Sequence, residues 1–259
     1  MIINKKKEDF IFLILYLILF LILVEGFICR PLIGPSWHIE CHLDNPPLLC
    51  KHGYCKVGFL KYFWLENGFV EILQIILLIP SIFLLIKAKY LFSEDKIINT
   101  FLIIKILALI YYLGEEISWG QHFFNWSSPI WFLEYNNQKE TNIHNISNLF
   151  DQLPRTLVIT WCTLVPITVI IIKYFYKFNN KLLNLLCPDK KLFYLALLTL
   201  FFILPDLIVD KFDLHPNNNT GYYYDMFTFN FLKLSELHEL LFCYYFLFYS
   251  IFFNKLKKN

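Results

Sequence analysis

The chain has 259 residues, of which 57% are hydrophobic, 19% aromatic and only 17% charged, and its mean hydropathy is +0.50. Soluble domains carry about a quarter charged residues and roughly 45–50% apolar residues. This composition excludes a disordered chain, a collagen-like repeat, a nucleic-acid-binding module and an ordinary cytosolic enzyme. It indicates one all-α integral-membrane domain over residues 1–259. The partner expected for such a domain is membrane lipid.

Six apolar stretches approach the length needed to cross a bilayer. A hydrocarbon core about 30 Å thick requires roughly 20 apolar residues in a helix, because backbone polar groups must be paired inside it. The sequence predicts a polytopic bundle of about six transmembrane helices, at approximately 10–28, 67–87, 97–117, 156–176, 191–210 and 234–253.

The first stretch has a second interpretation. Lys5, Lys6 and Lys7 precede it, and Val24-Glu25-Gly26 resembles a small-residue cleavage site, so a signal peptide is the alternative to an uncleaved helix. Both interpretations place the following loop outside.

The distribution of charge predicts the orientation of the spans. With the N-terminus inside, the inner segments hold 14 Lys against five acidic residues, and the outer segments hold eight cations against 16 acidic residues. Cytoplasmic loops of membrane proteins are enriched in Lys and Arg. We therefore expect both termini in the cytoplasm and a location in a bacterial inner membrane.

The outer loop at residues 29–66 carries four of the seven cysteines, at Cys29, Cys41, Cys50 and Cys55. Cysteines gathered on the outer side of a membrane are typical of disulfides formed in an oxidising compartment. The same loop contains His38, His42 and His52, and the His/Cys spacings would also permit zinc. We favour two disulfides, with three possible pairings.

A polar segment at residues 115–151 follows the third predicted span. If that helix continued, Glu115, Ser118 and His122 would share one stripe, and Glu116 would lie on another face with Trp119. Ionisable groups at membrane depth are costly and usually face a partner or a wet cavity. We expect Lys105, inside the third span, to meet an acidic residue from another helix.

Further along, Glu140, His144, Ser147 and Asp151 follow helical spacing, which predicts a short helix at the outer interface. Carboxylate and imidazole groups suit a divalent metal that would activate water, or a metal-free acid–base site. The alternative is that these groups are solvated helix ends, caps and inter-helix hydrogen bonds; Glu236 and Glu239 fit a helix N-terminus equally well. We expect catalytic groups at Glu115, Glu116, Ser118 and His144, substrate-binding groups at Trp119, Gln121, Asn142 and Asn145, and metal ligands at Glu116, Glu140, His144, Glu236 and Glu239.

The sequences GEEISWGQ at 114–121 and QKETNIHN at 138–145 resemble a group of uncharacterised bacterial integral-membrane proteins with a GEExSWGQ…ETNxHN pattern. The resemblance covers about 30 residues and implies no activity. His122 stands where that group usually has Arg. A second, partial resemblance is to the alkaline-ceramidase-like membrane hydrolases, whose Ser-x-x-x-His element matches Ser118 and His122. Their later His-x-x-x-His is not matched, because Phe242 follows His238, and seven spans are usual there.

Three functions remain open on the sequence. The first is a membrane-embedded, metal-assisted or metal-free enzyme acting on a lipid or lipid-linked substrate at the outer face, which the acidic outer groups favour. The second is a transporter or ion-conducting protein, and the third is a non-catalytic scaffold that uses the cysteine loop. No nucleic-acid partner is expected.

Overall fold

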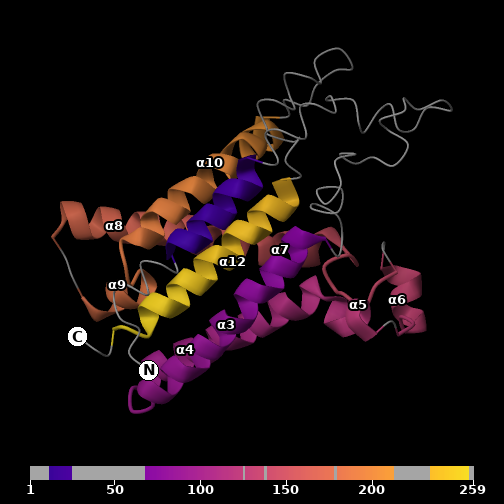
Figure 1. Ribbon diagram of the computed structural model, residues 1–259, viewed down its shortest axis with the longest axis horizontal. Coiled ribbons are helices and arrows are strands. Elements are labelled where there is room, and N and C mark those ends of the chain that lie inside the picture. The colour runs from indigo at the N-terminus through magenta and orange to yellow at the C-terminus, as the bar shows by residue number, and fades with distance from the viewer. Residues whose placement is uncertain are drawn as a thin grey trace. The chain divides into compact units, whose positions relative to one another are not determined.

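The computed structural model describes residues 12–24, 68–124, 126–136, 139–177, 180–212 and 234–256, and these ranges contain helices, turns and no strands (Figure 1). Cys29, Cys41, Cys50, Cys55, both chain ends and the loop at 213–233 lie outside the described residues. The predicted disulfides and zinc alternative therefore stay predictions.

The described helices match the predicted spans closely. Three helical stretches are long and apolar enough to cross a membrane, at Phe69–Leu91, Lys96–Glu116 and Gln152–Phe175. The other three predicted spans are helical where described, and the total of six stays a prediction. In chain order the elements are a helix at residues 12–24, α3 (Phe69–Leu91), α4 (Lys96–Glu116), η2 (Ser118–Gly120), α5 (Gln121–Phe124), α6 (Ile130–Tyr135), α7 (Asn148–Ile159), η3 (Thr160–Leu164), α8 (Val165–Phe175), α9 (Lys181–Leu186), α10 (Lys191–Phe212) and α12 (Leu234–Phe253).

The chain divides into two units. One holds residues 1–63 and 204–237, and the other holds residues 64–203 and 238–259. The second unit contains α3 to α9, the first part of α10 and nearly all of α12. The candidate site lies entirely within it.

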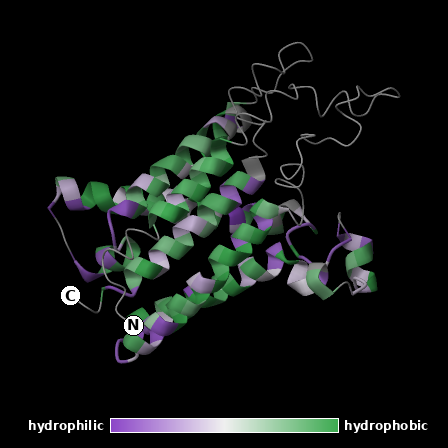
Figure 2. Cartoon of the chain, viewed as in Figure 1, coloured by the Kyte–Doolittle hydropathy of each residue, from purple (hydrophilic) through white to green (hydrophobic). Residues whose placement is uncertain are grey.

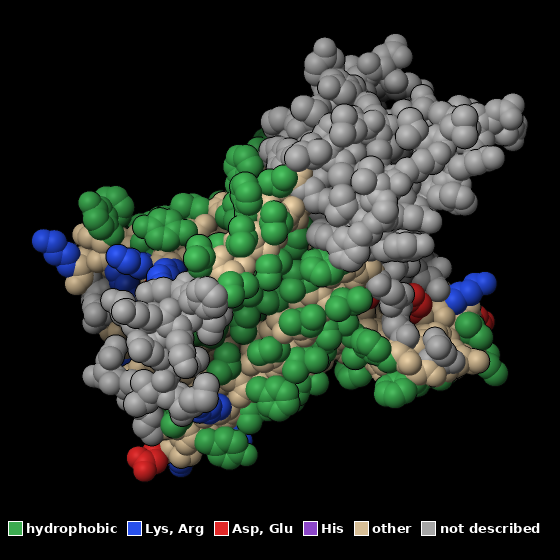
Figure 3. All heavy atoms as spheres, in the orientation of Figure 1, with side chains coloured by type: hydrophobic (Ala, Val, Ile, Leu, Met, Phe, Trp, Pro, Cys, Tyr) green, Lys and Arg blue, Asp and Glu red, His purple; other side chains and the backbone are tan. Residues whose placement is uncertain are grey.

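The long helices consist largely of hydrophobic residues (Figure 2), and hydrophobic side chains spread over them on the face seen in Figure 3. Many large apolar side chains on α3 and α4 are exposed, for example Ile76, Phe83 and Leu107. Exposed apolar residues on long apolar helices suit a lipid environment. In lipid, helices associate through close packing and hydrogen bonds, because lipid chains are as apolar as the side chains.

Helix α12 is buried along most of its length. Its side chains from Leu240 to Ser250 are buried on all faces, including the bulky Tyr244, Tyr245 and Phe248. The Tyr249 hydroxyl donates to the carbonyl oxygen of Leu185 over 2.7 Å. Aromatic side chains supply large packing areas, which explains why a helix of only moderate hydropathy occupies the interior.

The lysine-rich end of this unit is connected by hydrogen bonds. Asp95 caps α4 by accepting from the Ile98 amide over 3.0 Å, and Lys181 forms an ion pair with the same carboxylate. The hydrogen bond from Lys181 lowers the pKa of Asp95. The Asn254 side-chain amide, just beyond α12, donates to the Leu84 carbonyl on α3 over 2.8 Å. These contacts connect the start of α4 with α9, and the end of α12 with α3.

Lys105 contacts aromatic rings, not the acidic residue that we expected. Its Nζ atom lies 2.8 Å from the centroid of the Trp161 ring and about 6 Å from the rings of Phe101 and Tyr249. Trp161 belongs to η3, a π-helical turn. Pro166, two residues into α8, has no N–H to donate to the Cys162 carbonyl, which favours this irregular turn.

Candidate functional site

The site begins where α4 stops. The helix ends at Glu116, and Ser118, Trp119 and Gly120 have φ angles of 45°, 54° and 96°, all in the left-handed region. The prediction that one helix carries Glu115, Ser118 and His122 is therefore wrong. A left-handed turn is costly for residues other than glycine, so contacts elsewhere must hold it.

Trp119 supplies one of these contacts. The turn brings its indole ring back over Gly114, where a Cβ atom would lie only 3.0 Å from three ring carbons. Its Nε1 atom donates to the Glu115 Oε1 atom over 2.8 Å. Gly114 and Glu115 therefore form a seat for the ring, and the predicted substrate-binding Trp119 has a structural contact on the protein itself.

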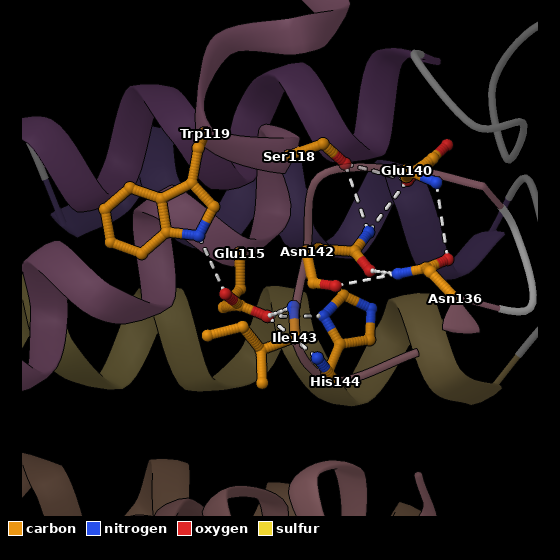
Figure 4. A network of polar contacts seen from close by, with 8 residues as sticks. All are labelled: Glu115, Ser118, Trp119, Asn136, Glu140, Asn142, Ile143 and His144. Carbon is orange, nitrogen blue, oxygen red and sulfur yellow. Dashed lines mark hydrogen bonds and ion pairs between the residues drawn. The ribbon is translucent and has the colours of Figure 1, made fainter. Parts of the chain in front are cut away.

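The Glu115 carboxylate joins the end of α4 to the segment before α7 (Figure 4). Its Oε2 atom accepts from the backbone amides of Ile143 and His144 over 2.7 and 2.9 Å, and lies 3.1 Å from the His144 Nδ1 atom. The Glu115 side chain is 5% exposed, whereas that of His144 is 37% exposed. An ionised carboxylate has only acceptors, and the four donors around Glu115 match it.

Residues 139–147 do not form the predicted interfacial helix; they form turns, and α7 begins only at Asn148. The backbone amides at 143 and 144 bond to Glu115 and so are not available for helical hydrogen bonds. Glu140 and His144 consequently do not share a helical stripe. Tertiary contacts override the helical spacing of the sequence here.

A second network of hydrogen bonds, around Glu140 and Asn142, also holds the segment at 139–147 (Figure 4). The Ser118 hydroxyl donates to Glu140 Oε2 over 2.7 Å, and the Asn142 amide donates to both, over 3.1 and 2.8 Å. The Asn136 amide donates to the Asn142 carbonyl and side-chain oxygens over 2.7 and 2.8 Å. Ser118 and Asn142 are buried, so the predicted catalytic Ser118 and predicted ligand Glu140 serve here as internal hydrogen-bonding partners.

Gln121 completes the attachment. Its Oε1 atom accepts from both the amide and the hydroxyl of Thr141 over 2.8 Å, and its Nε2 atom donates to the Ser128 hydroxyl over 2.9 Å. Ser128 in turn donates to the Lys139 carbonyl over 2.7 Å. The polar residues of the two motifs, at 114–121 and 138–145, therefore bond mainly to one another. Together they fix the backbone that carries His144.

A cavity of about 90 Å³ opens beside this network. His144 lines it together with Glu115 and Glu116 at the end of α4, while α7 and α12 supply the opposite walls. Two of its lining residues, Arg155 and Glu239, form an ion pair, with Nη2 and Oε1 3.7 Å apart. The lining residues are Tyr111, Tyr112, Glu115, Glu116, His144, Phe150, Pro154, Arg155, Val158, Glu239 and Phe242.

The predicted site residues thus fall into separate groups. Glu115, Glu116, His144 and Glu239 line the cavity, and Ser118, Glu140 and Asn142 form the buried network. Asn145 is half-buried, and Glu236 belongs to the other unit. The His122 side chain lies outside the described residues. No group of three or more His, Cys, Asp or Glu side chains in the described ranges is arranged to hold a metal ion.

Arg155 was missed by the sequence analysis, although it is one of only two arginines in the chain. The sequence does show that Arg155 stands just before a predicted span, at its outer end. Acidic residues outnumber cations on the predicted outer side, so a cation at this position was the signal that could have been used. The aromatic wall from Tyr112 and Phe242 carried no signal in a chain with 28 Phe and 16 Tyr.

No protein-family model, curated protein or solved structure matches this chain.

The Glu115–His144 pair is the arrangement with the clearest chemical consequence. A hydrogen bond at one ring nitrogen of a histidine sets which nitrogen carries the proton. In the tautomer whose Nδ1 donates to the carboxylate, Nε2 is an acceptor. None of the described residues forms a hydrogen bond with Nε2. The geometry is that of an imidazole oriented by a carboxylate beside a cavity, as acid–base catalysis requires.

Proposed function

We propose that this protein is a membrane-embedded enzyme that transforms a lipid or lipid-linked substrate by acid–base chemistry at His144. The observation that carries the proposal is the 3.1 Å contact between Glu115 Oε2 and His144 Nδ1 at the wall of the cavity.

In the proposed reaction, His144 Nε2 removes a proton from a water molecule or a substrate hydroxyl group, and that oxygen attacks an ester or phosphoester group of the substrate. The bond from this group to the leaving oxygen breaks, and the imidazolium gives its proton to the leaving oxygen. Glu115 keeps the ring in the required tautomer and stabilises the imidazolium that forms. Hydrogen bonds from Trp119 and from the 143–144 backbone hold Glu115 in place. Such positioned proton transfer typically contributes about 10²–10⁴-fold to a rate.

The proposed location follows from charge. If the lysine-rich end faces the cytoplasm, the end of α4 and the start of α7 lie at the outer face of a bacterial inner membrane. The full proposal has six spans with both ends of the chain inside. A substrate headgroup would reach the cavity from the outer leaflet.

The proposed chemistry uses no metal. A divalent metal bound by Glu116, Glu140, His144, Glu236 and Glu239 stays a separate prediction. It is tested by elemental mass spectrometry on purified protein, comparing wild type with Glu116→Gln. Stoichiometric metal that is lost in the variant would add a metal-assisted step.

The test of the function is untargeted lipid mass spectrometry on membranes from cells that express wild type, His144→Gln or a control, Trp131→Phe. Trp131 lies on α6 and does not line the cavity. We expect lipid species that change with wild type and the control but not with His144→Gln. If wild type and His144→Gln membranes have the same lipid composition at equal expression, the proposal is wrong.

A further inference from the structure

We propose that an apolar surface on the segment between α4 and α7 lies in the lipid–water interface of the bilayer and anchors the cavity at that depth. This anchor surface consists of six large side chains around α5 and α6, namely Phe123, Phe124, Trp126, Ile130, Trp131 and Leu133. Its partner is lipid, at the level of the headgroups and the first part of the acyl chains. The contact would be the same in either orientation of the chain, and it needs no catalysis.

The anchor surface is open. All six of its side chains are exposed, and Phe124 and Ile130 reach 76% and 83%. Helix α6, which is described in full, has no buried residue. The rings of Phe124 and Trp126 stack on each other, with their centroids 5.9 Å apart. Patches of large apolar side chains are uncommon on surfaces that face water, so this surface indicates a contact with something apolar.

The polar side chains of the same segment are inside it. Ser118, Ser128, Asn136 and Asn142 are buried. They bond within the segment, for example from the Ser128 hydroxyl to the Lys139 carbonyl over 2.7 Å and from the Asn136 amide to the Asn142 carbonyl over 2.7 Å. A folded segment in water has the reverse distribution, with apolar groups inside and polar groups outside. Paired polar groups inside and apolar groups outside are what an apolar surrounding requires.

The anchor surface continues the exposed apolar surface of α4. Near the end of that helix, the Tyr111 and Trp119 rings lie 6.3 Å apart, centroid to centroid, and Trp119 is 44% exposed. The next backbone position, Gly120, touches the anchor surface, because a Cβ atom there would lie 3.1 Å from the Trp126 ring. Aromatic rings therefore connect α4 with the segment that holds α5 and α6 (Figure 1). Since α4 is apolar enough to cross a membrane, the lipid around it is the partner that this continuity favours.

The residue types of the anchor surface suit the interface better than the hydrocarbon core. Tryptophan prefers the headgroup level of membranes, and the surface contains Trp126 and Trp131. Exposed polar side chains accompany them in the sequence, at Ser127, Glu134 and Lys139. A carboxylate is costly in hydrocarbon, so Glu134 on α6 limits the surface to a shallow depth at which polar groups still reach water.

The anchor surface is joined to the cavity by hydrogen bonds. Gln121, at the start of α5, accepts from the amide and the hydroxyl of Thr141 over 2.8 Å. The segment at 139–147 that contains Thr141 also carries His144, which lines the cavity. Contact of α5 and α6 with the interface therefore fixes the cavity at the level of the lipid headgroups.

The experiment uses the full chain, labelled with fluorotryptophan, in nanodiscs of phosphatidylcholine and phosphatidylglycerol. The ¹⁹F NMR signals of Trp126 and Trp131 are assigned by their loss in Trp126→Phe and Trp131→Phe. Three paramagnetic probes are compared: a lipid with a nitroxide next to its headgroup, a lipid with a nitroxide at the end of its acyl chain, and a gadolinium chelate in the water. We expect both signals to lose most intensity with the nitroxide next to the headgroup.

The matched control is Phe83→Trp, because Phe83 is an exposed residue near the middle of α3. Its signal should lose most intensity with the nitroxide at the end of the acyl chain. For Trp126 and Trp131, that same result would place the anchor surface in the hydrocarbon core. Strongest loss with the chelate would show that the surface faces water. No loss with any probe would show that protein covers it, either another segment of this chain or a second copy. Each of these three results for Trp126 and Trp131 would overturn the proposal.

This proposal and the proposed function fail in different ways, since the NMR signals report contact and not turnover. Interfacial contact without His144-dependent turnover would keep the anchor surface and remove the enzyme. His144-dependent turnover with Trp126 and Trp131 facing water would keep the enzyme and remove the anchor surface.

Discussion

Glu115 holds two segments of the chain in place through one carboxylate. It fixes the left-handed turn through Trp119, and it fixes the segment at 143–144 through two backbone amides and one imidazole nitrogen. Its neighbour Glu116 lines the same cavity but takes no part in these bonds of Glu115. Adjacent carboxylates thus have different environments, because they leave the helix about 100° apart.

The structural role of Glu115 predicts a loss of stability in Glu115→Gln. The substitution keeps the shape but places an amide group, itself a donor, among four donors. Hydrogen bonds to a charged group contribute about 1.5–3 kcal/mol, so we expect unfolding to become easier by about 3 kcal/mol. The free energy of unfolding in mixed micelles measures this. Glu134→Gln is the matched control and should change it by less than about 0.5 kcal/mol. Equal stability of both variants would show that Glu115 does not anchor the segment.

The sequence drew attention to Glu115 and His144 but did not predict how they are arranged. Glu115 and His144 could be singled out because ionisable groups at the end of an apolar span are costly. Their contact could not be derived, since it depends on a left-handed turn in which two of three residues are not glycine. That turn is imposed by the packing of Trp119 on Gly114 and by the bonds of Ser118 to Glu140 and Asn142. The two bonds of Ser118 join residues more than 20 positions apart.

At the scale of elements, the spans were the most predictable feature because apolar runs of about 20 residues allow little else. The segment at 139–147 was the least predictable. Its polar residues have helical spacing, yet its backbone donors are used by Glu115. Within the spans, the partner of Lys105 was also predicted wrongly, because a sequence gives no sign that η3 directs Trp161 at it.

The Lys105–Trp161 contact is tested by a double-mutant cycle with Lys105→Met and Trp161→Leu. Both an ammonium and a neutral amine are attracted to a ring face, and we expect a coupling free energy of about 1 kcal/mol. Met retains the length of the Lys side chain, so lost packing should be small. The free energies of unfolding of the four proteins give the coupling. Additive effects within about 0.3 kcal/mol would mean that the contact contributes nothing.

For the whole molecule, the proposed function requires the cavity to lie at the outer face of the membrane. We expect Ser93→Cys, between α3 and α4, to be shielded in intact cells, and Ser127→Cys, between α5 and α6, to react with an impermeant maleimide. Peptide mapping by mass spectrometry reads each introduced thiol separately from the natural cysteines. Labelling of Ser93→Cys from outside, with Ser127→Cys shielded, would reverse the orientation and place the site in the cytoplasm.

The most direct measurement of the central claim is ¹⁵N NMR of histidine-labelled protein, with the His144 signals assigned by their loss in His144→Gln. At about pH 8 an ordinary imidazole is neutral, so each ring has one protonated nitrogen. The account predicts that His144 carries its proton on Nδ1, toward Glu115, and that Nε2 is the unprotonated acceptor. A proton on Nε2 would contradict it, because His144 would then present a donor, not a base, at the cavity.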